Sequence, residues 1–157
     1  MLKNYQIKAL LVVCLMAIFG GVSAWAQTTV TQDSFSAVEG NVDNDTNVSY
    51  KTAKGGGTSD PAINSNVIRL YKISSGKTYG GTITISVADG YELSEVVIGS
   101  SMATKIAYTL DNAAATELSA SENLPANGKY TKSSLANQSI TFYCMGTTTK
   151  SRLYVNY

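Results

Sequence analysis

The sequence predicts an all-β protein, an antiparallel β-sandwich of the jelly-roll or Greek-key type, built from about seven or eight short strands. Short runs rich in Thr, Val, Ile and Tyr are separated by Gly, Asn, Asp and Ser. Several runs alternate apolar and polar residues with the period of a half-buried strand. No window after Ala26 keeps a sustained helical period. A closed barrel is the alternative architecture.

Residues 1–26 are predicted to be a cleavable secretory signal peptide. Two lysines, Lys3 and Lys8, precede an apolar run at residues 9–21. This run is too short to span a bilayer. The Ala-Trp-Ala sequence ending at Ala26 supplies the small residues that precede a cleavage site, so the mature chain would begin at Gln27. An uncleaved N-terminal anchor is the alternative. We therefore expect an exported protein, extracellular, on the outer surface or in the periplasm. Residues 27–157 are expected to form one domain with no membrane span.

The N-terminal part of this domain, residues 27–65, is expected to hold one or two strands and a polar loop. One strand is expected between residues 28 and 38, and a second at residues 48–52. The rest of residues 40–61 is rich in Asn, Asp and Gly and is expected to be loop. The three glycines at residues 55–57 are interpreted as a flexible turn.

The core of the sandwich is expected in residues 66–157, where the strand signals are sharper. Residues 82–87 alternate cleanly, with Ile and Val side chains on one face. Asp89-Gly90 is a tight-turn dipeptide, so residues 82–99 are predicted to form a hairpin. We expect the last strand to lie at the edge of a sheet. Its unpaired backbone groups can then pair with another subunit and form an oligomer. The expected strands are residues 67–73, 82–87, 93–99, 105–111, 129–132, 138–145 and 152–157, with mostly loop at 112–125.

No catalytic residues are predicted. The sequence contains no His, which removes the usual general base and the most frequent zinc or copper ligand. Cys144 is the only Cys after residue 26, so neither an intramolecular disulfide nor a thiolate metal site can form there. A reactive or intermolecular thiol is one interpretation of Cys144, and we favour a small buried apolar side chain.

Paired carboxylates could still hydrolyse glycosides, which keeps a glycoside-active enzyme as a third hypothesis. We expect the acidic side chains to be solvated surface charges instead. The acidic candidates are Asp89, Glu92, Glu95, Asp111, Glu117 and Glu122. Loss of Lys3 and Lys8 with the signal peptide would change the formal net charge from +1 to −1. A near-neutral domain lacks the basic footprint of a nucleic-acid-binding protein, so no nucleic-acid partner is expected.

One segment suggests a metal. Asp43, Asp45 and Asn47 place oxygen ligands at alternate positions, as at the start of a calcium loop. The loop then departs from that pattern, because Val48 and Lys54 occupy the positions where Gly and Glu are required. Calcium is the one cofactor that the sequence suggests, bound through irregular loop oxygens.

Tyrosine is the one residue type in surplus. Nine of the ten tyrosines follow residue 26. Aromatic faces stack on sugars and also serve protein contacts, whereas cross-strand packing is the structural alternative. Tyr79, Tyr91 and Tyr130 lie at predicted turns, where binding residues concentrate, so they are the candidate ligand-binding residues.

Short motifs follow one another in a recognisable order over residues 55–157. They are Gly-Gly-Thr-Ser-Asp-Pro (56–61), Val-Ile-Arg-Leu-Tyr (67–71), Thr-Ile-Thr-Ile-Ser (82–86), Gly-Tyr-Glu-Leu-Ser-Glu-Val-Val-Ile (90–98), Gly-Lys-Tyr (128–130), Ser-Ile-Thr-Phe (139–142) and Arg-Leu-Tyr-Val-Asn-Tyr (152–157). This order resembles small β-sandwich modules found in secreted and surface proteins of Bacteroidetes. The resemblance implies a sandwich and export, and it transfers no catalytic residues. Tyr130 stands where many such modules place Trp.

Together these observations predict a secreted or cell-surface binding module without catalytic activity. An extracellular glycan is the first expected ligand. A structural or adhesive role through contacts with a surface protein is the alternative.

Overall fold

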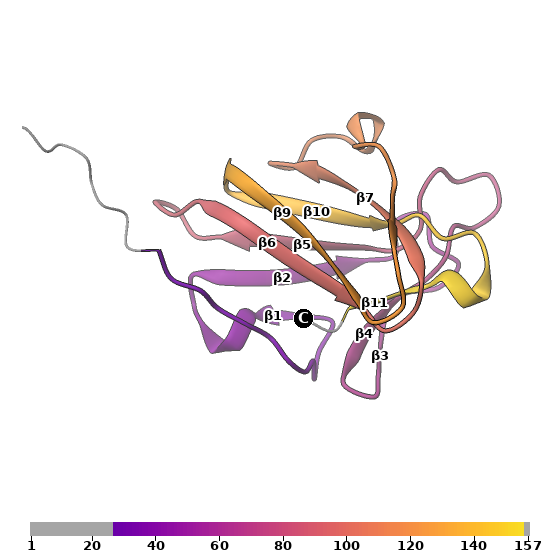
Figure 1. The fold of residues 1–157 in the computed structure, drawn as a ribbon, viewed down its shortest axis with the longest axis horizontal. Coiled ribbons are helices and arrows are strands. Elements are labelled where there is room, and N and C mark those ends of the chain that lie inside the picture. The colour runs from indigo at the N-terminus through magenta and orange to yellow at the C-terminus, as the bar shows by residue number, and fades with distance from the viewer. Residues whose placement is uncertain (1–26, 156–157) are drawn as a thin grey trace, which may run out of the picture.

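The computed structural model describes residues 27–155, which form two antiparallel sheets packed face to face. The prediction of an all-β sandwich is confirmed, and the two separate sheets exclude the single closed barrel. The predicted signal peptide, residues 1–26, lies outside the described residues. In Figure 1, β6 and β9 of one sheet cross in front of β2, β5 and β10 of the other.

The first sheet has six strands. In spatial order they are β1 (Glu39–Asn41), β2 (Val48–Ala53), β5 (Thr82–Val87), β10 (Ser139–Cys144), β7 (Thr104–Leu110) and β8 (Glu122–Leu124). The second sheet has five strands: β3 (Ala62–Asn64), β4 (Val67–Leu70), β11 (Leu153–Val155), β6 (Leu93–Ser100) and β9 (Gly128–Asn137). Three short 3-10 turns lie between strands: η1 (Val42–Asn44), η2 (Ala115–Glu117) and η3 (Thr149–Ser151).

The core lies between the two sheets, where alternate side chains of facing strands meet. Ile140 and Phe142 of β10 and Ile98 of β6 are 0 % exposed. Burying an aromatic or aliphatic side chain of this size stabilises the fold by about 1.5–3 kcal/mol. The alternation predicted for β5 is confirmed, because Ile83 packs in this core. Thr84 points the other way and hydrogen-bonds the hydroxyl of Thr141 across the sheet (2.8 Å).

The predicted hairpin over residues 82–99 is wrong. β5 pairs with β2 and β10 in the first sheet, whereas β6 pairs with β11 and β9 in the second. The turn at Asp89-Gly90 does form, with Gly90 at φ +85 and the Tyr91 N–H donating to the Ala88 carbonyl (3.1 Å). A tight turn can join two strands of the same sheet or two strands of different sheets. The Asp89-Gly90 dipeptide alone therefore does not determine which strands pair.

The last strand is not an edge, which corrects a second expectation. β11 lies inside its sheet, between β4 and β6. The edges of the second sheet are β3 and β9, and those of the first are β1 and β8. β9 has ten residues, so the long edge of this sandwich is β9 and not the C-terminal strand.

The N-terminal third contributes more structure than expected. β1 and β3 were not predicted as strands, and β2 pairs along its whole length with β5. The strand expected between residues 28 and 38 does not form. Phe35 of this segment is nevertheless buried at 4 %, with its ring edge-on to Tyr50 at 5.1 Å. The turn predicted at the three glycines does form, with Gly55 at φ +50 and the Gly57 N–H donating to the Lys54 carbonyl (2.7 Å). Gly56 and Gly57 are buried, and Gly57 forms a bridge with Ile73.

Candidate functional site

An open hollow of about 430 Å³ lies beside β7 and the loop that follows it. Its lining combines one aromatic ring with a carboxylate, two hydroxyls and two aliphatic side chains. The lining residues are Tyr108, Thr109, Leu110, Ala113, Glu117 and Ser119. Ligand sites have this mixture of an apolar surface and a few convergent polar groups.

Tyr108, one of the lining residues, belongs to β7. It lies opposite Phe142 in the register with β10, and the two rings are 6.4 Å apart. The Tyr108 N–H donates to Ser119 Oγ (3.0 Å), and the Ser119 N–H donates to the Tyr108 carbonyl (2.9 Å). These two bonds hold the loop after β7 against the strand, so the loop forms one wall of the hollow.

A second layer of side chains comes from β9. The Tyr130 ring lies 6.4 Å from that of Tyr108 and 6.1 Å from that of Phe142. Lys132 places its Nζ 5.4 Å from the centroid of the Tyr108 ring. A cation over an aromatic face is attracted by the negative electrostatic potential of the ring. The Lys132 ammonium therefore lies over the ring of a residue that lines the hollow.

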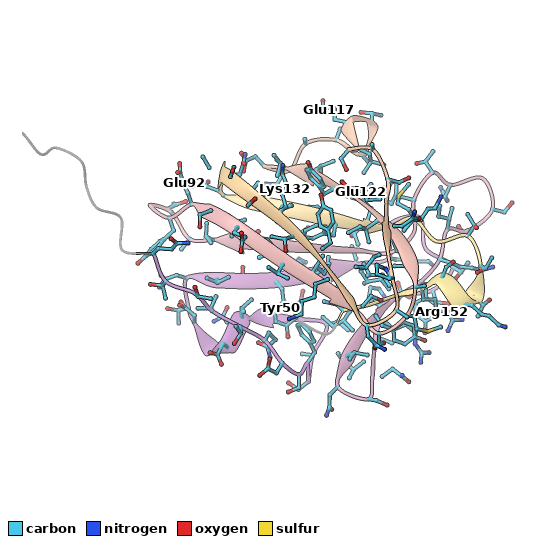
Figure 2. All side chains as sticks on the ribbon, in the orientation of Figure 1. Tyr50, Glu92, Glu117, Glu122, Lys132 and Arg152 are labelled. Carbon is cyan, nitrogen blue, oxygen red and sulfur yellow. The ribbon has the colours of Figure 1, made fainter. Side chains whose placement is uncertain are left out.

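Tyr130 is also tied to a carboxylate. Its hydroxyl donates to Glu122 Oε1 of β8 at 3.3 Å. Burial, and then the negative charge of Glu122, raise the pKa of Tyr130 to about 12. Tyr130 is therefore a neutral hydrogen-bond donor throughout the physiological range. Figure 2 shows Glu117, Glu122 and Lys132 in the upper part of the view, near β7 and β9.

The three tyrosines predicted as binding residues do not come together. Tyr79 precedes β5 and Tyr91 follows it, so one strand of six residues, about 20 Å long, separates them. Tyr79 is half-buried, with its ring edge-on to Tyr143 at 4.9 Å. Tyr91 is 51 % exposed, the only exposed large apolar side chain among residues 27–155. Tyr130 lies within β9, opposite Ile98, and not in a turn as expected.

Tyr130 is thus the only one of the three candidate tyrosines near Tyr108, and Tyr108 itself was not among the candidates. The sequence did contain a signal for Tyr108, since it lies on the same face of its strand as Ile106 and Leu110. That period identifies an inward-facing residue. It does not reveal that β7 lies next to the edge of its sheet, where an inward-facing ring can still reach solvent.

The suggested calcium ligands lie in and after η1. Asp43 has φ +49, and its N–H donates to Gln32 Oε1 at 2.7 Å. Asp45 and Asn47 are brought together, because the Asn47 N–H donates to Asp45 Oδ1 at 2.7 Å. Within the described part of the chain, no group of three or more His, Cys, Asp or Glu side chains is arranged to hold a metal ion.

Cys144 is buried at 0 % exposure, which confirms the interpretation as a small buried side chain. Its Sγ lies 3.7 Å from the Ser151 carbonyl and 4.0 Å from Thr104 Oγ1. Burial raises the pKa of the Cys144 thiol. A thiol in this environment is a poor nucleophile, because the thiolate is the reactive form.

Asp111 has a structural role beside the hollow. Its carboxylate accepts hydrogen bonds from Asn137 Nδ2 (2.7 Å), the Gln138 N–H (2.8 Å) and the Ser139 N–H (3.1 Å). The bonds from Asn137, then Ser139, lower the pKa of Asp111, and the Gln138 bond adds to this effect. The carboxylate ties the end of β7 to the turn between β9 and β10.

Comparisons with known proteins found no matching family model, no matching curated protein and no matching solved structure. Within residues 27–155 there is no helix with the length and apolar character needed to cross a membrane. The chemistry of the site itself is therefore the basis for assigning a function.

Proposed function

We propose that this protein is an exported, non-catalytic binding module whose hollow beside Tyr108 takes an extracellular glycan. The observation that carries the proposal is the hollow of about 430 Å³, which is lined by Tyr108 together with a carboxylate and hydroxyl-bearing side chains. A sugar ring presents an apolar face to an aromatic side chain, and its hydroxyls need donors and acceptors at the edge. Glu117 and Ser119 supply acceptors, and Lys132 supplies a donor held by the ring.

Export is part of the same proposal. Its support is the sequence of residues 1–26, with its apolar run and Ala-Trp-Ala site. The resemblance of the short motifs in residues 55–157 to surface modules of Bacteroidetes is a second support for export. N-terminal sequencing of the secreted protein tests this part, and a mature N-terminus at Gln27 is expected.

The test of binding is a glycan array probed with the purified protein. Glu117→Gln removes a charge that lines the hollow, and Lys132→Met removes the ammonium over the Tyr108 ring. Each change is expected to weaken binding about tenfold. Tyr91→Ala is the matched control, because Tyr91 is exposed in the turn between β5 and β6 and does not line the hollow. Absence of binding to every glycan, or equal loss in the Tyr91 variant, would contradict the proposal.

One observation favours the adhesive alternative. β9 is a ten-residue edge strand, and an edge offers unpaired backbone groups to another chain. Two features restrain such pairing: Lys129 and Lys132 lie on the strand, and Ser134 has φ +57, which interrupts its regular geometry. Because of these features we place glycan binding first. Sedimentation that shows a stable dimer, lost on a Pro substitution in β9, would favour adhesion instead.

A further inference from the structure

The sequence contains two arginines, Arg69 and Arg152, and the fold brings both onto one surface. Arg69 lies in β4 between Ile68 and Leu70, which are both 0 % exposed, so Arg69 faces away from the core. Arg152 directly precedes Leu153, which is buried and pairs with Leu70. Two residues far apart in the chain thus become neighbours on the outer face of the second sheet.

Two tyrosines alternate with the arginines. Tyr154 lies opposite Arg69 in the register, with the Arg69 guanidinium 5.2 Å from its ring centroid. Tyr71 receives both cations, with Arg152 at 4.8 Å and Arg69 at 5.9 Å. We call these four residues the Arg–Tyr face. It lies on the sheet that does not carry the hollow of Tyr108, and Figure 2 shows Arg152 well away from Glu117.

The guanidinium groups are fixed in position but not neutralised by carboxylates in the described part of the chain. The Nε atoms of Arg69 and Arg152 are buried and have no hydrogen-bond partner. The register neighbours are uncharged: Ala62 of β3 lies opposite Arg69, and β6 meets β11 at Ser100. Stacking on tyrosine orients the planar group, so its terminal nitrogens form an ordered set of donors.

We propose that the Arg–Tyr face binds an anionic polysaccharide through carboxylate or sulfate groups. Arginine recognises these anions with two parallel hydrogen bonds, which lysine does not. All other basic residues of the chain are lysines, so the pairing of both arginines at one place matches this chemistry.

A polysaccharide fits this face better than an acidic peptide. β4 and β11 are internal strands, with hydrogen-bonded neighbours on both sides. A peptide therefore cannot add here as a further strand, and recognition must use side chains alone. A repeating carboxylated or sulfated sugar needs only the local donors and the flanking rings.

Biolayer interferometry with immobilised polygalacturonate and heparin tests the inference, with dextran as the neutral polymer. The two anionic polymers separate carboxylate from sulfate recognition. The protein is expected to bind at least one of them, and raised salt is expected to weaken the interaction. Arg69→Gln combined with Arg152→Gln is expected to weaken binding by at least about tenfold. The double Arg→Lys variant keeps both charges, and a loss of about threefold is expected because the planar donor pair is removed.

Lys51→Gln is the matched control, since it removes one positive charge from an exposed position on β2 of the other sheet. It should bind like the wild type. No binding to either anionic polymer, or unchanged binding by the arginine variants, would overturn the inference. Equal loss in Lys51→Gln, or stronger binding to polyglutamate than to both polysaccharides, would also overturn it. If the Arg→Gln pair does not fold by circular dichroism, the Arg→Lys pair decides.

Discussion

Replacement of Ser100 by Ala removes only one oxygen atom, but it should destabilise the sandwich by about 2–3 kcal/mol. Ser100 is 0 % exposed at the end of β6. Its hydroxyl donates to the Met102 carbonyl (2.8 Å) and accepts from the N–H groups of Met102 (3.3 Å) and Tyr154 (3.1 Å). The hydroxyl therefore joins β6, the turn after it and β11. Alanine would leave these backbone groups without that partner, and a buried unsatisfied group costs about 1–3 kcal/mol.

Urea denaturation followed by circular dichroism measures this effect, together with a thermal melt. For a domain of this size, about 1 kcal/mol lowers Tm by roughly 3 °C, so a decrease of about 6–9 °C is expected. Ser101→Ala is the matched control. Among the described residues the Ser101 side chain makes no hydrogen bond, and its removal should cost less than about 0.5 kcal/mol. Equal stability of the two variants would refute the role assigned to the Ser100 hydroxyl.

Three further predictions follow from the fold. Gly80→Ala should cost about 3 kcal/mol or more in urea melts, because its Cβ would overlap the Tyr71 carbonyl oxygen, whereas Gly40→Ala meets only ordinary contacts and should be nearly neutral. Asp111→Asn should lower stability at pH 7. The folded pKa of Asp111 is lowered, so the stabilisation by its carboxylate is fully present above the unfolded pKa of about 4 and is lost as pH falls through the folded value. A stability difference from the Asn variant that does not narrow as the pH falls below about 4 would contradict this. Cys144 should react with iodoacetamide at least about a hundredfold more slowly in the folded protein than in denaturant, and rapid native labelling by mass spectrometry would show that it is accessible.

The strands and the core were largely predictable because they follow a local period. The alternation of residues 82–87 and 138–145 identifies β5 and β10, and the structure places the inward side chains of both in the core. Short strands escaped prediction because their pairing is not local. β1, β3 and β8 have three residues each, too few to show a period, and they exist because a neighbouring strand supplies hydrogen bonds.

Topology could not be derived from turn chemistry. The Asp89-Gly90 turn was expected to join two paired strands, but the chain passes there from one sheet to the other. The C-terminal strand was expected at an edge, yet β11 lies between β4 and β6. In both cases the sequence predicts the strand, and the choice of partner depends on which other strands already occupy the neighbouring positions.

The candidate site was predictable only in its residue type. A surplus of tyrosine directed attention to aromatic residues, and Tyr130 does lie beside the hollow. Tyr79 and Tyr91 were selected because they flank turns, but β5 holds them apart. The Arg–Tyr face arises from segments far apart in the sequence, so no local pattern could reveal that Arg69 and Arg152 share Tyr71.

The most direct test of the proposed function is an NMR titration of the ¹⁵N-labelled protein with the glycan that gives the strongest array signal. If the hollow is the binding site, the amides of Tyr108, Ala113, Glu117 and Ser119 shift most, and those of the turn at Asp89-Gly90 do not move. Shifts confined to that turn or to other surfaces, with the hollow unchanged, would contradict the assignment of glycan binding to the hollow beside Tyr108.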